Sequence, residues 1–420
     1  MTGRAGDAPA PLAQRLLFTL GALVIYRLGT YIPLPGIDLY VLQDMFGRNG
    51  GGFLGKVDMF SGDALGHMSI FALHIMPYLT VSFWALLLGA LWPRFGALNR
   101  RGGRTFDRYI RAAAVVVAAL QAYGIAVGLE SAGGGRSPVI DPGLFFRFTT
   151  VITLTGGTVF LMWLGEQITA RGIGNGYALL LFTGIVARMP AALGSLLELG
   201  RISALSTQFI LLFLLLAAAI VVFIVFMESA QRSIRVHYRP RLLADRMFEG
   251  EGAYLRLKLN QAGIIPLFIV PQLLLLPATF ASYRVEAQAD WMDWLFAHLS
   301  RGQPGYLLAY AVLIGGFCFL YTALIFRPRN MAETLRNYAG FIPGYEEERQ
   351  AADHLTGVLT RLTLVGALYL ALVCTLPEIL VAQYGLPFYF GGTTLLVVVC
   401  IAMDLQAQFS VELAEAAKGR

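Results

Sequence analysis

The sequence predicts an all-α polytopic membrane protein with ten transmembrane helices in two halves of five. Two observations carry this prediction: ten long apolar stretches, and a composition with 57% hydrophobic and only 14% charged residues. The mean hydropathy of +0.64 agrees. A bilayer span needs about 20 mostly apolar residues. Because lipid offers no partner for an unpaired N–H or C=O group, each span is expected to be a helix.

The apolar stretches place the ten helices in order along the chain. We expect them near 16–32, 68–91, 110–129, 145–166, 176–193, 206–227, 264–282, 306–326, 362–381 and 387–404. The loop at 194–205 then separates an N-terminal half, 1–193, from a C-terminal half, 206–420. Five helices on either side of one hinge are typical of an inverted-repeat membrane fold.

Basic residues divide unequally between the loops on the two sides of the membrane. With ten spans both termini lie on one side, and that side holds 23 of the 32 Lys and Arg residues. The positive-inside rule makes it the cytoplasmic side. The net charge of +6 therefore describes cytoplasmic loops, which suit anionic lipid headgroups or an RNA-containing partner such as the ribosome.

Three segments differ from the spans. The Gly-rich stretch Gly50–Gly66 is too short to cross a bilayer, and a half-helix at membrane depth is tolerated where it lines a cavity, so it indicates a pore. The loops 228–258 and 327–361 are expected to project into the cytoplasm as docking surfaces. Pro and Gly residues in the second loop predict rigid turns around a short helix from Met331 to Tyr338.

The residues favour a non-enzymatic protein. The chain has no H-E-x-x-H, no G-x-S-x-G and no phosphate-binding Gly-rich loop. Its three cysteines fall singly within apolar spans, so neither a metal nor another cofactor is expected. The main alternative class is a small-solute secondary transporter, which would need polar or ionisable coupling residues at mid-membrane. The spans are poor in such residues.

Over about 15–408, the ordered strings of the chain resemble the SecY family, the protein-conducting channel subunit of the bacterial Sec translocon. The most distinctive is Phe160–Thr169 followed by Arg171-Gly-Ile-Gly-Asn-Gly176. The other matching strings are Tyr26–Asp38, Met59–Gly62, Ser69–Leu73, Met76–Tyr78, Lys258 with Asn260, Phe341–Gly344, Leu364–Leu368 and Pro387–Thr393.

This resemblance implies two pseudo-symmetric halves around a central pore, with a lateral gate between spans 2/3 and 7/8 and a plug near 53–65. It implies a channel in the bacterial cytoplasmic (inner) membrane that translocates unfolded secretory polypeptides and releases apolar segments sideways into the lipid. The implied partners are SecE, SecG, SecA, the ribosome, and secretory and membrane-protein precursors. A specialised second-copy SecY with an altered partner or substrate range is an alternative.

The resemblance also assigns roles to individual positions. A ring of apolar side chains can pass a polypeptide and still hold back ions by dewetting. The pore ring is expected at Ile75, Leu79, Tyr177, Leu181, Phe268 and Val397. The lateral gate is expected at Thr80, Gln121 and Asn260, and the plug at Phe53, Leu54, Val57, Met59, Phe60 and Leu65. Docking of cytoplasmic partners is expected at Arg232, Arg235, Arg239, Arg241, Arg329 and Glu346.

The chain departs from the family pattern at several of these places. Tyr177 and Phe268 stand where the family generally has Ile or a similar residue, which predicts a tighter or stickier ring. His74 stands where the family usually has Gly, and we expect its imidazole to bond a backbone carbonyl. Ser233 leaves one Arg of a usual pair, and the acidic triplet beginning at Glu346 reverses the local field, which puts docking of a standard SecA in doubt.

Overall fold

The computed structural model describes most of the chain. The described residues are 12–42, 68–131, 138–203, 206–238, 241–243, 246–248, 253–270, 273, 303–338, 340–345, 347–384 and 392–418. Two compact units are present: unit 1 contains residues 1–207, 387–389 and 397–420, and unit 2 contains residues 208–386 and 390–396. Each unit is described by itself below.

The described residues form long helices, as predicted. In chain order these are α1 (Leu12–Gly29), α4 (Met76–Leu91), α5 (Pro93–Ser131), α6 (Leu144–Arg171), α7 (Gly176–Arg201), α8 (Thr207–Ser229), α11 (Pro304–Ile325), α13 (Glu348–Tyr384) and α14 (Gly392–Lys418). Within the described ranges, eight helices are long and apolar enough to cross a membrane, and Met76–Gly89 is a shorter apolar helix. The prediction of an all-α membrane protein is confirmed.

Some element bounds differ from the predicted ones. The helix expected from residue 68 begins only at Met76, because Pro77 favours a helix start and residues 68–75 form turns. The loop expected at 194–205 is shorter, since α7 continues to Arg201. The span expected at 264–282 is described as helix over 265–270, and most of its remainder lies outside the described residues.

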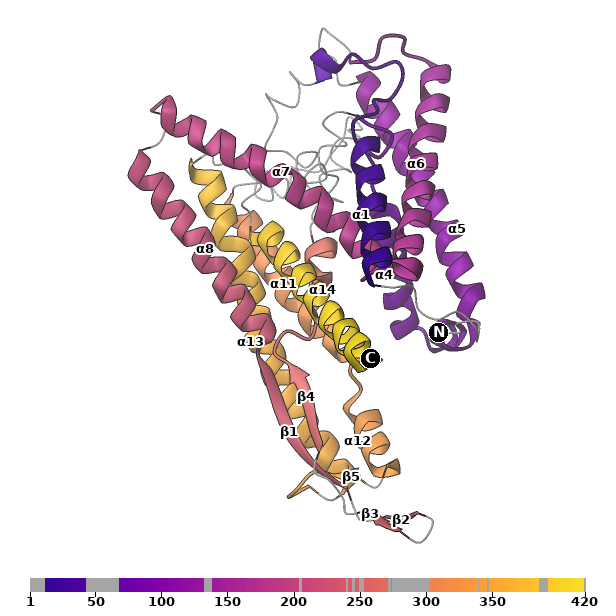
Figure 1. The fold of residues 1–420 in the computed structure, drawn as a ribbon, viewed down its shortest axis with the longest axis vertical. Coiled ribbons are helices and arrows are strands. Elements are labelled where there is room, and N and C mark those ends of the chain that lie inside the picture. Colours follow the sequence, from indigo (N-terminus) through magenta and orange to yellow (C-terminus); the bar gives the residue numbers. More distant parts are fainter. Residues whose placement is uncertain are drawn as a thin grey trace, which may run out of the picture. The chain divides into compact units, whose positions relative to one another are not determined.

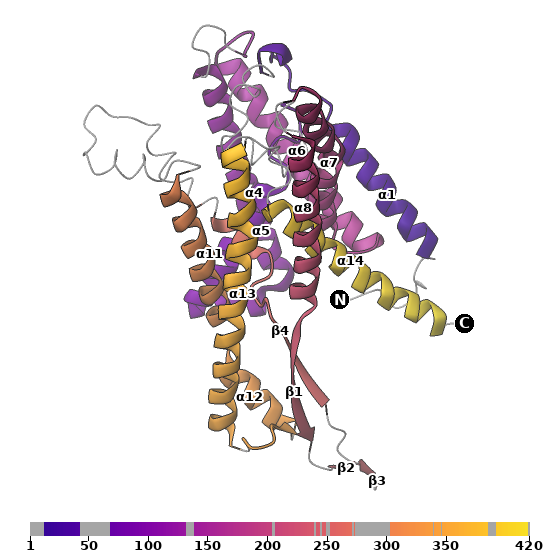
Figure 2. The same ribbon diagram turned by 90° about the vertical axis from the view of Figure 1, so that its left-hand side faces the viewer.

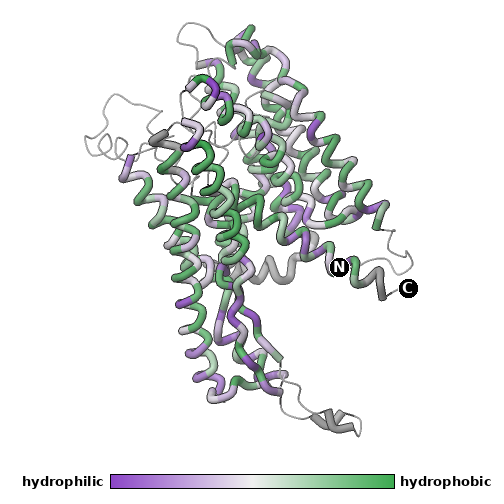
Figure 3. The backbone as a smooth tube through the Cα atoms, turned by 60° about the vertical axis from the view of Figure 1, so that its left-hand side comes forward, coloured by the Kyte–Doolittle hydropathy of each residue, from purple (hydrophilic) through white to green (hydrophobic). Residues whose placement is uncertain are grey.

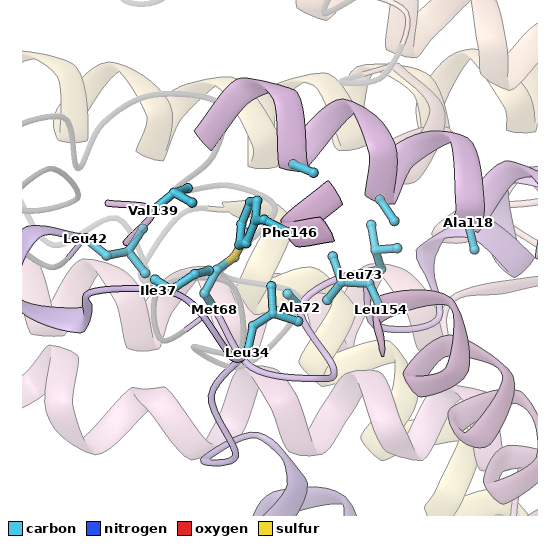
Figure 4. Close-up of a cluster of buried hydrophobic side chains, with 12 residues drawn as sticks. Leu34, Ile37, Leu42, Met68, Ala72, Leu73, Ala118, Val139, Phe146 and Leu154 are labelled. Carbon is cyan, nitrogen blue, oxygen red and sulfur yellow. The ribbon is translucent and has the colours of Figure 1, made fainter. Parts of the chain in front are cut away.

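The core of unit 1 joins its helices to the turns that precede α4. Figure 4 shows Met68, Ala72 and Leu73 from those turns among side chains of the neighbouring elements, including Phe146 and Leu154 of α6. Ala118, Ala122 and Ala126 supply the α5 side of this cluster at four-residue spacing. Their small side chains let helix backbones approach closely, as is typical of helix packing in membranes.

Unit 2 combines a helical bundle with a small sheet. Strand β1 (Gln231–Tyr238) continues from α8 and pairs antiparallel with β4 (Ala253–Lys258) and β5 (Gly340–Phe341), in the order β4-β1-β5 (Figures 1 and 2). The short strands β2 (Arg241–Leu243) and β3 (Arg246–Phe248) form a separate pair. Helix α12 (Pro328–Asn337) matches the short helix predicted in the second loop.

We name the hairpin module by its members: β1, β4, β5, α12 and residues 348–361 of α13. Its core contains Ile234 and Leu257 from the strands and Leu355 and Leu359 from α13. The loop expected at 228–258 as a cytoplasmic docking surface contains a β-hairpin, which the sequence analysis did not specify. The signal was the alternation of apolar Ile234 and Val236, both buried, with polar neighbours along β1.

Candidate functional site

The predicted pore-ring residues come from both units. Ile75, Leu79, Tyr177, Leu181 and Val397 belong to unit 1, whereas Phe268 belongs to unit 2. Ile75 is the N-cap residue of α4 and is fully buried. Leu79 lies one turn later in α4, Tyr177 and Leu181 lie in the first two turns of α7, and Val397 is buried on α14. Four of these ring positions therefore fall at the starts of two helices.

An aromatic contact brings the start of α4 to the start of α7. The rings of Tyr78 and Tyr177 stack with centroids 4.6 Å apart. The Tyr177 hydroxyl donates to Glu166 Oε1 at 3.4 Å, and Arg111 Nη1 lies 3.0 Å and 3.1 Å from the two oxygens of Glu166. Tyr177 is thus bound to α6 through Glu166, and its aromatic side chain packs against Tyr78 of α4.

The glycines of the α6–α7 segment make room for this arrangement. A Cβ added at Gly165 would lie 2.7 Å from the Tyr177 ring, and one at Gly176 would collide with the Gly165 carbonyl. Gly174 adopts a φ of 85°, a conformation that glycine tolerates without strain. Asn175 then caps α7 by accepting from the N–H groups of Tyr177 and Ala178. The motif therefore fixes where α7 begins.

Arg15 binds the backbone of this same segment. Its guanidinium donates from Nε and Nη2 to the Gly172 carbonyl, at 3.1 Å and 2.8 Å, and Nη2 pairs with Glu412 Oε1 of α14 at 2.8 Å. Thr19 Oγ1 accepts from the Ile173 N–H at 3.1 Å. Arg15 therefore positions the turn before α7 against α1 and α14. Arg15 is one of the basic residues counted on the cytoplasmic side, and no local motif in the sequence marks its partners.

His74 occupies a strained and apolar place beside Ile75. Its φ is 51°, which explains why glycine is the expected residue there. The imidazole is fully buried and meets the Tyr26 ring edge-on at 5.4 Å. A backbone group of Leu180 faces it, but in a geometry too poor for the expected hydrogen bond, and neither ring nitrogen has a partner by distance and angle among the described residues.

The predicted gate residues also belong to both units. Thr80 on α4 is half-buried and Gln121 on α5 is exposed, both in unit 1. In unit 2, Asn260 Nδ2 donates to Glu228 Oε1 at 2.7 Å, and its Oδ1 accepts from the Gly263 N–H at 3.1 Å. The Asn260 amide thus ties the start of the helical segment 265–270 to the end of α8.

The docking and plug residues are described in part. Arg232 and Arg235 are exposed on β1, Arg241 lies in β2, and Arg329 is exposed on α12. Arg239, Glu346 and all six predicted plug residues, Phe53, Leu54, Val57, Met59, Phe60 and Leu65, lie outside the described residues. Within the described ranges, no group of three or more His, Cys, Asp or Glu residues could hold a metal ion.

These features define a multi-pass helical membrane protein whose first unit gathers apolar and aromatic side chains at helix starts. The chain belongs to the SecY family, whose model matches residues 69–406. It is 43% identical over 401 residues to the protein translocase subunit SecY of Escherichia coli K12, covering 94% of this chain and 90% of the relative. The Vibrio cholerae SecY is 42% identical over 409 residues, covering 96% and 92%.

Solved structures of low sequence identity share the fold. The structure titled "The structure of a protein conducting channel" aligns with a TM-score of 0.68 and 16% identity, over 98% of this chain and 94% of that one. Sec61 in the canine ribosome-channel complex from the endoplasmic reticulum aligns with a TM-score of 0.65 and 15% identity, over 98% and 94%. The ten-helix prediction is consistent with this fold.

Proposed function

We propose that this chain is the channel subunit of a protein translocase. It passes unfolded secretory polypeptides across the membrane and releases apolar segments laterally into the lipid. The carrying observation is the match to relatives named protein translocase subunit SecY along nearly the whole chain. The fold supports it, because protein-conducting channels share that fold.

In this proposal the ring at Ile75, Leu79, Tyr177, Leu181, Phe268 and Val397 seals against ions by dewetting and deforms around a passing chain. Its support in the structure is local: the Tyr78–Tyr177 stack and the Arg15 contacts fix the helix starts that carry four of the six residues. No bond is made or broken, so the chain acts without catalysis and ATP hydrolysis or chain elongation supplies the energy elsewhere.

The gate at Thr80, Gln121 and Asn260, the plug at 53–65 and the two halves around a hinge that follows Arg201 belong to the same proposal. Polar latches inside lipid contribute about 0.6–2 kcal/mol per hydrogen bond, small enough for a signal sequence to displace. The Asn260 amide donates to Glu228 within unit 2, so for Asn260 to act as a latch this hydrogen bond must break when the lateral gate opens or closes.

The proposed location is the bacterial cytoplasmic membrane, with both termini and the hairpin module on the cytoplasmic side. The proposed partners are SecE, SecG, SecA and the ribosome. Support for a ribosome comes from a fold neighbour solved as a ribosome-channel complex. The exposed Arg232, Arg235 and Arg329 would meet them.

A specialised second-copy channel is the second candidate. Tyr177 favours it, because an anchored aromatic ring stands where the family generally has an aliphatic side chain. A narrower substrate range would follow from a ring that deforms less.

Transport into inverted membrane vesicles tests the proposal. Vesicles from cells in which this chain replaces the resident SecY receive a signal-bearing precursor, ATP and SecA. We expect signal-dependent protection of the precursor from added protease. Solute uptake without precursor protection would instead support a secondary transporter and would contradict the proposal. Precursor protection for only a subset of signal sequences would favour the specialised channel.

A further inference from the structure

The hairpin module contains a pocket beside strand β1. Its volume is about 420 Å³, and it is lined by residues of β1, of the turn after β5 and of α13. Strand residues Arg232 to Arg235 form one wall, the turn Ile342 to Tyr345 forms another, and His354 and Val358 come from α13. His354 stacks on Tyr345 with ring centroids 4.2 Å apart, so part of the lining is a flat aromatic surface.

This pocket lies where β1 has an open edge. Strand β4 covers one edge of β1 over residues 231–236. On the other edge, β5 pairs only with His237 and Tyr238. The chain then leaves the sheet at Pro343, which has no N–H to donate, and at Gly344, whose φ is 87°. Among the described residues, no strand continues this pairing along residues 231–236, and such an edge is a template for an added strand.

The charged side chains in the pocket lining are cationic. The lining contains Arg232 and Arg235, and none of its residues carries a carboxylate. Arg232 has no ion-pair partner among the described residues. Of the acidic residues that follow Tyr345, Glu348 forms an ion pair with Arg336 at 2.7 Å, and Glu347 accepts a hydrogen bond from Gln350 at 3.0 Å. Arg235 donates to the Tyr254 hydroxyl of β4 at 3.2 Å, so Arg232 is the cation that an acidic ligand would meet here.

We propose that this pocket binds an extended acidic peptide segment of a partner protein, which adds as a strand to the open edge of β1. Backbone hydrogen bonds to β1 give the affinity, and the peptide side chains on the face that β1 shares with α13 meet Arg232 and the Tyr345–His354 surface. The inference rests on the proposed function, which places the hairpin module on the cytoplasmic side of the membrane, where partners bind. It adds the chemical class of the ligand and its mode of binding.

Peptide binding to the full chain in lipid nanodiscs tests this proposal. The probe is a fluorescent octapeptide of alternating Glu and Val, measured by anisotropy at low salt. One comparison peptide replaces each Glu by Lys, and another replaces each Val by Pro, which keeps the charge but removes backbone donors. We expect binding of the Glu-Val peptide and at least roughly tenfold weaker binding of the other two.

Matched variants locate the site. Arg232→Glu should weaken binding by roughly tenfold, whereas Arg256→Glu, an equal charge change on β4 away from the lining, should leave it within about twofold. Val358→Trp fills the pocket and should abolish binding. Val365→Trp, on the same helix but outside the lining, should not.

Several results would overturn the proposal. These are no binding of the Glu-Val peptide, equal binding of the Glu-Pro peptide, equal effects of the two arginine reversals, undiminished binding of the Glu-Val peptide to Val358→Trp, or binding of a labelled single-stranded RNA but not of the peptide. Thermal unfolding of each variant separates loss of the site from loss of the fold. Precursor transport is measured on the same variants, so failure of the pocket is distinguishable from failure of the channel function.

Discussion

Helix α13 passes through two environments, and its two parts follow opposite rules. In residues 348–361 the buried residues are the adjacent Ala351 and Ala352, then Leu355 and Leu359 at helical spacing, and the remaining face is largely polar. Beyond residue 362 the exposed side chains are themselves apolar, including Leu368, which is 63% exposed. Figure 3 shows the same change, with hydrophobic colour along the later turns and hydrophilic residues gathered in the hairpin module.

The difference shows that apolar residues are buried in one part of this protein and exposed in the other. In the hairpin module, apolar residues are buried because water surrounds the module, so hydrophobic burial stabilises it. In the membrane helices, lipid is as apolar as leucine, so close packing of small residues must hold the helices together. Helix α8 illustrates the second case: it is almost entirely apolar, yet only 17% of its most apolar stretch is buried.

The largest effect is expected in the hairpin module. Leu355→Ala removes a fully buried side chain from its core and should destabilise the module by about 2–5 kcal/mol. Hydrogen exchange of the β1 amides measures this. The control is Leu368→Ala on the same helix, where lipid can fill the space and exchange in β1 should be unchanged. Equal effects of the two variants would break the comparison.

An introduced charge should be unfavourable in the lipid-facing part of α13 and tolerated in the part that belongs to the hairpin module. Leu368→Arg places a cation in the lipid-facing part and should cost about 2.5–3.5 kcal/mol of insertion free energy if the site lies near the bilayer centre. Thr360→Arg, on the exposed polar face of the hairpin module, should be tolerated. Resistance of each variant to alkaline extraction from membranes reads out insertion. An extractable Thr360→Arg beside an inserted Leu368→Arg would contradict the assignment.

Close backbone packing predicts a smaller, position-specific effect in unit 1. A Cβ at Gly157 would collide with the Ile70 carbonyl, while Gly156 next to it has nothing within 4 Å. Gly157→Ala should therefore destabilise unit 1 by about 1–3 kcal/mol, and Gly156→Ala should be neutral or slightly stabilising. Thermal unfolding in nanodiscs compares them. If both variants behave alike, close approach is not what holds these helices.

The smallest expected change is a gain. His74→Gly removes a strained backbone conformation and a buried imidazole with poor hydrogen bonding, so it should stabilise unit 1 by roughly 1 kcal/mol. His74→Ala serves as the control, because it removes the imidazole but keeps the positive φ. A lower thermal midpoint for His74→Gly would show that the imidazole stabilises unit 1 instead.

Much of the fold could be predicted from the sequence, because the membrane helices follow from apolar length alone. The turns at 68–75 could not, since their residues are as apolar as the helix that follows. The β-hairpin was missed because its alternation is short and its basic residues dominated the interpretation. The helix α12 was found because Pro328 and the FIPG turn bracket it.

The candidate site was less accessible to sequence reasoning. Arg15 and Glu412 are almost the whole chain apart, and nothing local marks them as partners. Tyr177 contacts Tyr78 and Glu166 of other helices. Local sequence does not show these contacts, so the sequence predicted only that Tyr177 is a bulky side chain in the pore ring. The positions of the ring, the gate and the plug came from family resemblance and stay predictions.

The central claim is that a polypeptide passes beside Leu79. The most direct measurement is photocrosslinking from a probe at position 79 to a stalled secretory precursor, in cells expressing this chain with SecE. A matched probe at position 120, on the exposed apolar face of α5, is the control. The account predicts a crosslink from position 79 that depends on the precursor's signal sequence, and none from position 120. No crosslink from position 79, with the chain inserted and bound to SecE, would contradict it.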